Sequence, residues 1–167
     1  LLVGTNLRWE APLVNTRVRK AIKKGAKVFG IGPETDLTYK LDWIGDDLAL
    51  LGDLPEVLTE AFGKAERPMV IVGGGALKGG HGAALKLVET LGLVKGDWNG
   101  FNIVHMAASR MGGLMLGYAQ SGGIADVMGA KLGFFLGADE VDYTKFAGFK
   151  VFVGHHGDVG AHHADVV

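Results

Sequence analysis

The sequence predicts an α/β protein with a doubly wound, mostly parallel sheet and flanking helices, a Rossmann-like arrangement. Short apolar runs that end in glycine or an acidic residue alternate along the chain with longer amphipathic segments. The runs lack the polar alternation of a half-exposed strand, which is typical of strands buried on both faces. Strands that alternate with helices imply right-handed βαβ units and therefore a parallel sheet.

The apolar runs are predicted strands, and the last four residues, 164–167, resemble the beginning of another. In chain order the runs are Leu1–Val3, Lys27–Ile31, Met69–Val72, Phe101–Val104, Leu132–Leu136 and Val151–Val153. The amphipathic segments between them are predicted helices: Ala11–Lys24, Leu54–Lys64, His81–Gly92 and Ile124–Lys131. Asp53 is expected to cap the second helix, because an aspartate oxygen accepts from the free N–H groups of a helix start and Pro55 suits its first turn.

Composition narrows the class of protein. The 167 residues are 48% hydrophobic and 21% charged, with a net charge of −1, which indicates a globular chain without a general attraction for nucleic acid. No uncharged apolar run approaches membrane-spanning length, so we expect no direct membrane insertion. The chain has no cysteine, which excludes disulfides and cysteine-ligated iron–sulfur clusters within it.

The chain is expected to be a fragment, residues 1–167, of a longer protein. It starts without methionine and stops inside a predicted strand. Residues 63–68, "GKAERP", are a predicted seam between two halves of the α/β region.

The stretch "VIVGGGALKGG", residues 70–80, predicts a buried strand that enters a glycine-rich loop before a helix. Glycine lets the backbone approach a pyrophosphate, and a helix N-terminus offers free N–H groups to it. The fingerprint G-x-G-x-x-G places Lys78 at its last position, and only a looser spacing through Gly73, Gly75 and Gly79 fits. The loop is therefore either a phosphate-binding loop or a tight turn whose glycines serve close packing.

Ligands of open α/β sheets bind beyond the carboxyl ends of the strands. On a single sheet, one candidate cleft is therefore lined by five loops: Gly4–Asn6, Gly32–Glu34, Gly73–Gly80, Gly137–Glu140 and Gly154–Asp158. None of them carries a nucleophile elbow, and we expect no catalytic residue. Asp139 and Glu140 are either an acid–base pair or a solvated helix start.

The segment "GHHGDVGAHHAD" is the densest group of metal-ligand residue types. His155, His156 and Asp158 are followed seven residues later by His162, His163 and Asp165. Imidazole and carboxylate suit zinc or iron, but neighbouring histidines point in different directions. We therefore expect no metal site, and histidines that bond to the backbone instead.

Four segments carry a family resemblance: "LLVGTNLRWEAPLVNTRVRKA", "MVIVGGGAL", "AASRMGGLMLGY" and "FVGHHGDVGAHHADVV". The whole chain resembles the C-terminal region of the large iron–sulfur subunit, the G subunit, of proton-pumping NADH:quinone oxidoreductase, respiratory complex I. That region is in turn similar to cofactor-binding domains of molybdopterin oxidoreductases such as formate dehydrogenase, which implies a molybdopterin-oxidoreductase-like fold.

The resemblance implies an inherited cofactor cleft. In molybdopterin oxidoreductases, the loops that match Gly4-Thr5-Asn6 and the segment before Ala164 line a cleft for a pterin guanine dinucleotide. The matching vestigial cleft candidates here are Gly4, Thr5, Asn6, Gly73, Gly75, Gly79, His155 and His156. These enzymes carry an acid and an arginine after the second strand, where this chain reads "GPET", residues 32–35, so guanine dinucleotide binding is not expected.

The resemblance also implies a non-catalytic scaffold and interface role. The parent's iron–sulfur clusters lie outside this chain, and the implied partners are other subunits of the peripheral arm of complex I. The implied location is peripheral, on the cytoplasmic side of the bacterial inner membrane. Two alternatives stay open: a cofactor-binding domain of an active molybdopterin oxidoreductase, and an independent nucleotide-binding module that uses Gly73–Gly80.

A basic face is predicted on the helix Ala11–Lys24, where Arg17, Lys20 and Lys24 share one side. The face either meets an acidic partner or is solvated.

Overall fold

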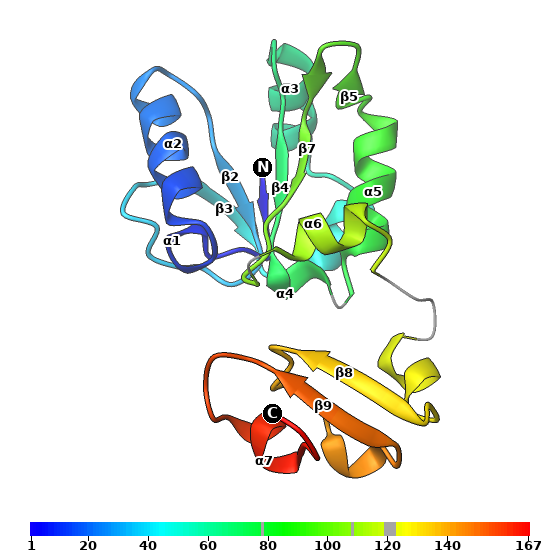
Figure 1. The fold of residues 1–167 in the computed structure, drawn as a ribbon. Helices are drawn as coiled ribbons and strands as arrows, with labels where there is room; N and C mark the ends of the chain where they lie inside the picture. The colour runs from blue at the N-terminus through cyan, green and yellow to red at the C-terminus, as the bar shows by residue number, and fades with distance from the viewer. Residues whose placement is uncertain (78, 108, 119–122) are drawn as a thin grey trace. The chain divides into compact units, whose positions relative to one another are not determined.

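A computed structural model describes residues 1–77, 79–107, 109–118 and 123–167. The chain forms two compact units, Leu1–Ala108 and Ser109–Val167, which are described separately (Figure 1). The boundary differs from the predicted seam, because residues 63–68 lie inside the first unit. Among the described residues, no helix combines the length and apolar character needed to cross a membrane.

The first unit contains a five-stranded parallel sheet with the strand order β3-β2-β1-β4-β7. The strands are β1 (Leu2–Val3), β2 (Phe29–Ile31), β3 (Asp42–Gly45), β4 (Val70–Val72) and β7 (Phe101–Ile103). β1 is central, because Leu2 pairs with Gly30 of β2 on one side and with Ile71 of β4 on the other. The predicted parallel α/β sheet is thus confirmed, with β3 as an additional edge strand.

Helices cover both faces of this sheet (Figure 1). They are α1 (Leu7–Glu10), α2 (Pro12–Lys23), the 3-10 helix η1 (Leu48–Leu51), α3 (Glu56–Lys64), α4 (Gly74–Leu77) and α5 (His81–Thr90). Leu2 packs with Leu7 and Val18 on one face, whereas Val3 packs with Leu58 and Leu87 on the other. Because neighbouring side chains of a strand point to opposite faces, β1 divides the core into two layers, as in a doubly wound sheet.

The predicted cap of α3 is wrong. Pro55, with φ −53° and ψ 146°, takes the N-cap position, and no side chain of the described residues caps this helix. The proline ring fixes φ near this value, which suits the residue before a helix. The helix therefore begins at Glu56, two residues after the predicted start at Leu54, and Asp53 lies too early in the chain to cap it. Asp47 caps η1 instead, where its Oδ1 accepts from the Ala49 N–H at 2.8 Å. A short hairpin that was not predicted, β5 (Val94–Lys95) and β6 (Trp98–Asn99), follows α5.

The second unit contains a separate parallel pair of strands, β8 (Leu132–Leu136) and β9 (Phe149–Val153). The predicted helix at residues 124–131 is wrong, because only the 3-10 helix η2 (Gly123–Val127) forms there and glycines flank it. Residues 164–167 form no strand, and Val166 makes a single bridge to Val151. The remaining elements are α6 (Arg110–Met115), η3 (Tyr143–Lys145) and α7 (Val159–His163).

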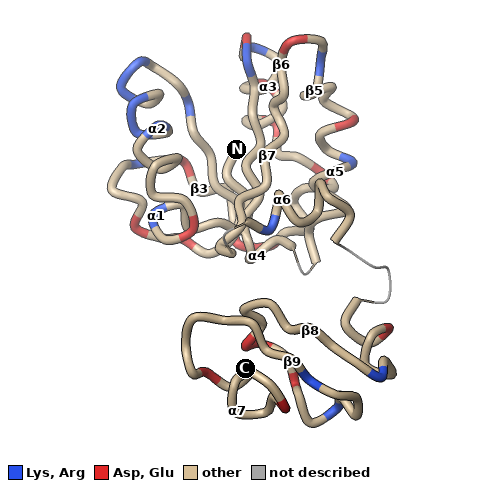
Figure 2. Tube along the Cα trace, in the orientation of Figure 1, with Lys and Arg blue, Asp and Glu red and all other residues tan. Residues whose placement is uncertain are grey.

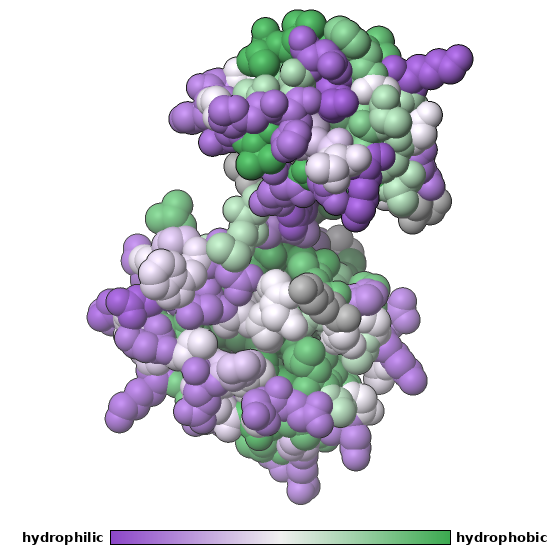
Figure 3. Space-filling model, turned by 90° about the horizontal axis from the view of Figure 1, so that it is seen from below, coloured by the Kyte–Doolittle hydropathy of each residue, from purple (hydrophilic) through white to green (hydrophobic). Residues whose placement is uncertain are grey.

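One face of the β8–β9 pair is packed and the other is exposed. Phe152 is only 2% exposed, and the ring of Phe135 lies 4.7 Å from that of Tyr143 and 5.2 Å from that of Phe146. The opposite face presents exposed apolar side chains: Leu132, Phe134, Leu136, Phe149 and Val153. Hydrophobic side chains also reach the surface in the space-filling view (Figure 3). The expectation that these strands are buried on both faces is therefore wrong.

Candidate functional site

Three of the five predicted cleft loops lie at the carboxyl edge of the first sheet. Gly4–Asn6 follows β1, Gly32–Glu34 follows β2 and Gly73–Gly80 follows β4, and these strands are neighbours. The other two loops follow β8 and β9 in a different sheet, so the expectation of one sheet with five such loops is wrong. The candidate site is therefore built from the loops after β1, β2 and β4.

Glycine lets two of these loops touch backbone to backbone. A Cβ on Gly73 would lie 2.3 Å from Cβ of Thr5, and a Cβ on Gly75 would lie 2.8 Å from the carbonyl oxygen of Gly4. Gly4 itself has φ +51°, which strongly favours glycine. Of the two alternatives for this loop, the close-packing role agrees with this geometry at Gly73 and Gly75. A Cβ on Gly79 would meet no atom of the described residues within 4 Å, so that role finds no support there.

The carboxylate of Glu10 joins the same two loops. Its Oε1 accepts from the Asn6 N–H at 2.7 Å, and its Oε2 accepts from the Gly74 N–H at 2.8 Å. Asn6 is the N-cap residue of α1, and Gly74 is the first residue of α4. One carboxylate therefore accepts hydrogen bonds from the free N–H groups at the starts of two helical turns. A bound phosphate would use the same N–H groups.

Three further N–H groups at the start of the glycine loop are also paired. Gly73 donates to the Val3 carbonyl at 2.9 Å, Gly75 to the Gly4 carbonyl at 2.9 Å, and Ala76 to the Gly73 carbonyl at 3.1 Å. A pyrophosphate here would have to displace these bonds and lie against the negative charge of Glu10. The residues present therefore do not fit a dinucleotide pyrophosphate. Lys78, which occupies the last fingerprint position, lies outside the described residues.

The ribose-binding acid of a dinucleotide site is also missing. The expected strand after the glycine loop is confirmed as β7, which lies beside β4. The chain then continues through Val104 and His105 rather than a carboxylate.

Several buried polar atoms near the carboxyl edge of the sheet have no hydrogen-bond partner among the described residues. They are Thr5 Oγ1, Asn6 Oδ1, Thr35 Oγ1 and His105 Nδ1.

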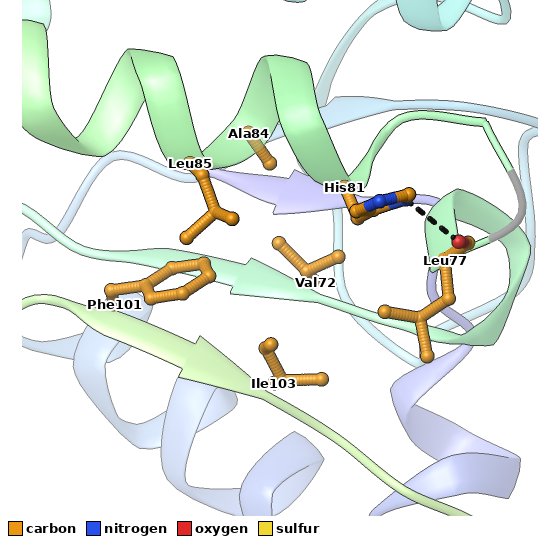
Figure 4. Close-up of a pocket in the computed structure, with 7 residues that line it drawn as sticks. All are labelled: Val72, Leu77, His81, Ala84, Leu85, Phe101 and Ile103. Atoms are coloured by element: carbon orange, nitrogen blue, oxygen red, sulfur yellow. Dashed lines mark hydrogen bonds between the residues drawn. The ribbon is translucent and has the colours of Figure 1, made fainter. Parts of the chain in front are cut away.

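A cavity of about 310 Å³ lies between α5 and the strands β4 and β7 (Figure 4). Its lining is apolar except for His81, whose Nδ1 is bonded to the Leu77 carbonyl oxygen at 3.0 Å. A larger cavity of about 660 Å³ lies at the opposite, amino-terminal end of the strands, where Leu1, Phe29 and Met69 line it. Glu10 and the loop Gly4–Asn6 line neither cavity.

The histidine pairs belong to the second unit, whereas the glycine loops belong to the first. His155 and His156 are exposed after β9, and their Nδ1 atoms contact each other. Among the described residues, neither ring makes the expected hydrogen bond to the backbone. His162 and His163 lie in α7, and His163 stacks on Tyr143 with ring centroids 6.0 Å apart. Within the described ranges, no three histidine or acidic side chains are grouped to hold a metal ion.

Asp139 has a structural contact. Its Oδ1 accepts from the Gly160 N–H at 3.1 Å, in the first turn of α7. Burial, and secondarily the Asp139 charge, raise the pKa of Tyr143. Glu140 is exposed, so the two carboxylates have different environments. Residues 139 and 140 belong to no helix, so they do not form the expected solvated helix start. Asp139 instead contacts the first turn of a different helix, α7.

Comparison with known proteins agrees with this fold. Residues 1–167 match the family described as Molybdopterin oxidoreductase. The chain belongs to this family. It is 40% identical over 177 residues to the G subunit of NADH-quinone oxidoreductase from Rickettsia typhi, and 37% identical over 182 residues to the NADH-ubiquinone oxidoreductase 75 kDa subunit of Reclinomonas americana. It is also 38% identical to the mitochondrial 78 kDa subunit of Candida albicans.

These alignments cover 100% of this chain and 24% to 26% of each of those three relatives. The chain thus spans about a quarter of the length of its relatives. The resemblance to the G subunit of NADH:quinone oxidoreductase is confirmed at the level of sequence identity over the full chain.

Proposed function

We propose that this chain is a non-catalytic structural and interface domain of the G subunit of an NADH:quinone oxidoreductase. In this proposal the parent complex moves electrons from NADH to quinone through iron–sulfur clusters that lie outside residues 1–167. The names of relatives at 37% to 40% identity support the parent assignment. The absence of cysteine from the sequence means that any cysteine-ligated cluster must be held elsewhere.

The two hydrogen bonds of Glu10 are the main support for a non-catalytic role. A carboxylate that bridges the Asn6 and Gly74 N–H groups takes the place of a bound anion in the inherited cleft. Because this anion is part of the chain, it holds the two loops together without any ligand. The cleft is then a closed structural joint rather than a cofactor site.

The proposed partners are other subunits of the peripheral arm of complex I. The proposed location is the cytoplasmic side of the bacterial inner membrane, reached through the complex. The names of the relatives support a place in such a complex, and the lack of a membrane-crossing helix in the described part of the chain agrees with a peripheral position.

Titration calorimetry with NADH and with GTP tests the closed cleft. We expect both to bind the chain with a dissociation constant weaker than about 1 mM. Inorganic phosphate should bind more tightly to Glu10→Ala than to the unmodified chain, because the substitution frees two N–H groups and removes a like charge. Glu66→Ala, which removes an exposed charge elsewhere, serves as the control. A micromolar nucleotide affinity that Gly75→Val abolishes in a folded protein would refute the proposal.

The alternative is the cofactor-binding domain of an active molybdopterin oxidoreductase, which the family match favours. This alternative requires the full-length protein to carry molybdenum and pterin after purification without an affinity tag. Elemental analysis separates the two proposals, because the structural domain requires neither.

A further inference from the structure

The helix α2 and its C-cap residue, Lys24, carry a continuous stripe on the solvent side. Leu13, Arg17, Lys20 and Lys24 follow at spacings of four, three and four residues, which places them on one helix face. Leu13 is 82% exposed, and Trp9, four positions earlier in α1, is 76% exposed. We call Leu13, Arg17, Lys20 and Lys24 the α2 stripe.

The α2 stripe lies in a strongly basic segment. Residues 17–27 contain six basic side chains, and residues 11–33 contain no acid: the basic residues are Arg17, Arg19, Lys20, Lys23, Lys24 and Lys27. Figure 2 shows this concentration of blue along α2. The ion pairs found among the described residues use Arg8, Lys64, Lys145 and Lys150, and none of these six. This local excess stands out in a chain whose net charge is −1.

The opposite face of α2 packs against the core of the first unit. Val14 and Val18 pack against the buried residues Leu2, Leu7, Leu37 and Ile71, and Asn15 is buried beside them. A helix that lies on a bilayer must offer its apolar face to the lipid, and this face is committed to the sheet. A nucleic-acid-binding domain usually has a basic overall charge, which this chain lacks.

We infer that the α2 stripe docks on an acidic surface of a partner protein, with Leu13 and Trp9 as apolar anchors. Because charges across an interface are complementary, we expect carboxylates of the partner to lie opposite Arg17, Lys20 and Lys24. An exposed leucine within a cationic stripe, and an exposed tryptophan four positions before it in the chain, match the pattern of apolar anchors within a polar rim. The inference rests on the proposed function, in which the partner is another subunit of the same complex.

The test uses the full-length subunit in its assembled complex, with a benzophenone amino acid in place of Leu13. We expect light to cross-link this position to a segment of another subunit that has more acidic than basic residues. The control places the same group at Val57, an exposed residue of α3. It should not give the same product.

Charge reversal supplies the second arm. We expect Arg17→Glu, Lys20→Glu and Lys24→Glu together to lower co-purification of the cross-linked subunit at least tenfold. Acid-to-lysine changes in the cross-linked segment should restore it. The matched control is Lys40→Glu, Lys86→Glu and Lys95→Glu, which reverses three exposed lysines outside the stripe. Circular dichroism should show that both triple variants are folded.

The outcomes separate the inference from the proposed function. If the subunit purifies with its complex but Leu13 gives no protein cross-link, the docking surface is refuted and the proposed function stands. If the subunit joins no NADH:quinone oxidoreductase, the proposed function fails, and an acidic cross-linked partner in another assembly would still support the docking surface. Stripe-dependent binding to phosphatidylglycerol vesicles or to duplex DNA at physiological salt would overturn the inference.

Discussion

The side-chain Nδ2 of Asn15 donates a hydrogen bond of 3.0 Å to the carbonyl oxygen of Leu37. Asn15 is only 7% exposed, in a helix whose other polar side chains face solvent, and Leu37 is 1% exposed in the connection between β2 and β3. The bond therefore ties α2 to a segment that lacks helix or strand hydrogen bonds of its own.

Replacement of Asn15 by leucine should lower the free energy of unfolding by about 1–3 kcal/mol, because the Leu37 carbonyl loses its buried partner. Urea unfolding followed by circular dichroism measures this change. Thr16→Ala, at the next and exposed position, is the control and should change stability by less than about 0.5 kcal/mol. Equal stability of the Asn15→Leu protein and the unmodified chain would contradict the tie.

Gly73→Ala should destabilise the first unit by about 1–3 kcal/mol, because the added methyl would lie 2.3 Å from Cβ of Thr5. Gly79→Ala, in the same loop, meets no atom within 4 Å and should stay within about 0.5 kcal/mol of the unmodified protein. Chemical denaturation of the two variants tests the difference. If both lose the same stability, the close approach of the loops is not the reason for Gly73.

Burial raises the pKa of Tyr39 to about 12, and its hydroxyl has no partner among the described residues. The unfolded chain would ionise this phenol near pH 10, so the folded state holds one more proton between about pH 10 and 12. Stability should therefore fall as pH rises from 10 to 12, and Tyr39→Phe should remove part of that fall. Urea midpoints measured from pH 9 to 12 check this. Identical slopes for the two proteins would contradict it.

Phe152→Ala should destabilise the second unit by about 3–5 kcal/mol, because this ring is 2% exposed and lies against Gly160 of α7. Phe134→Ala, on the exposed face of the same strand pair, should cost less than about 1 kcal/mol. Hydrogen exchange of the β8 and β9 amides reports the change within this unit. A large effect of Phe134→Ala would show that the exposed face is covered in solution.

Apolar strands were the most predictable part of the fold. Val70–Val72 and Leu132–Leu136 are uncharged apolar runs, and both were predicted within a residue. β3 reads "DWIG", residues 42–45, and lies at an edge of the sheet. Its aspartate and glycine break the apolar pattern, so the sequence does not predict this strand. Single helical turns such as α1 and α4 are also hidden, because four residues are too few to show a helical period.

The candidate site was predictable only in part. The glycine loop after β4 was visible, because strand and glycine composition mark it in the sequence. Glu10 was not, because its second partner, Gly74, is 64 positions away. The available signal was local: an acid four residues after Asn6 resembles a capping box with one extra residue.

The central position of β1 has a kinetic consequence. Its two residues pair with β2 on one side and with β4 on the other. The centre of the sheet can therefore form only when β4, near position 71, pairs with residues 2 and 3. Such long-range pairing must overcome loop-closure entropy before it gains contact energy. We therefore expect the first unit to refold slowly for its size, with β1–β4 pairing late. During synthesis on a ribosome, β1, α2 and β2 would emerge before β4, so the core beneath α2 would stay incomplete until β4 is made.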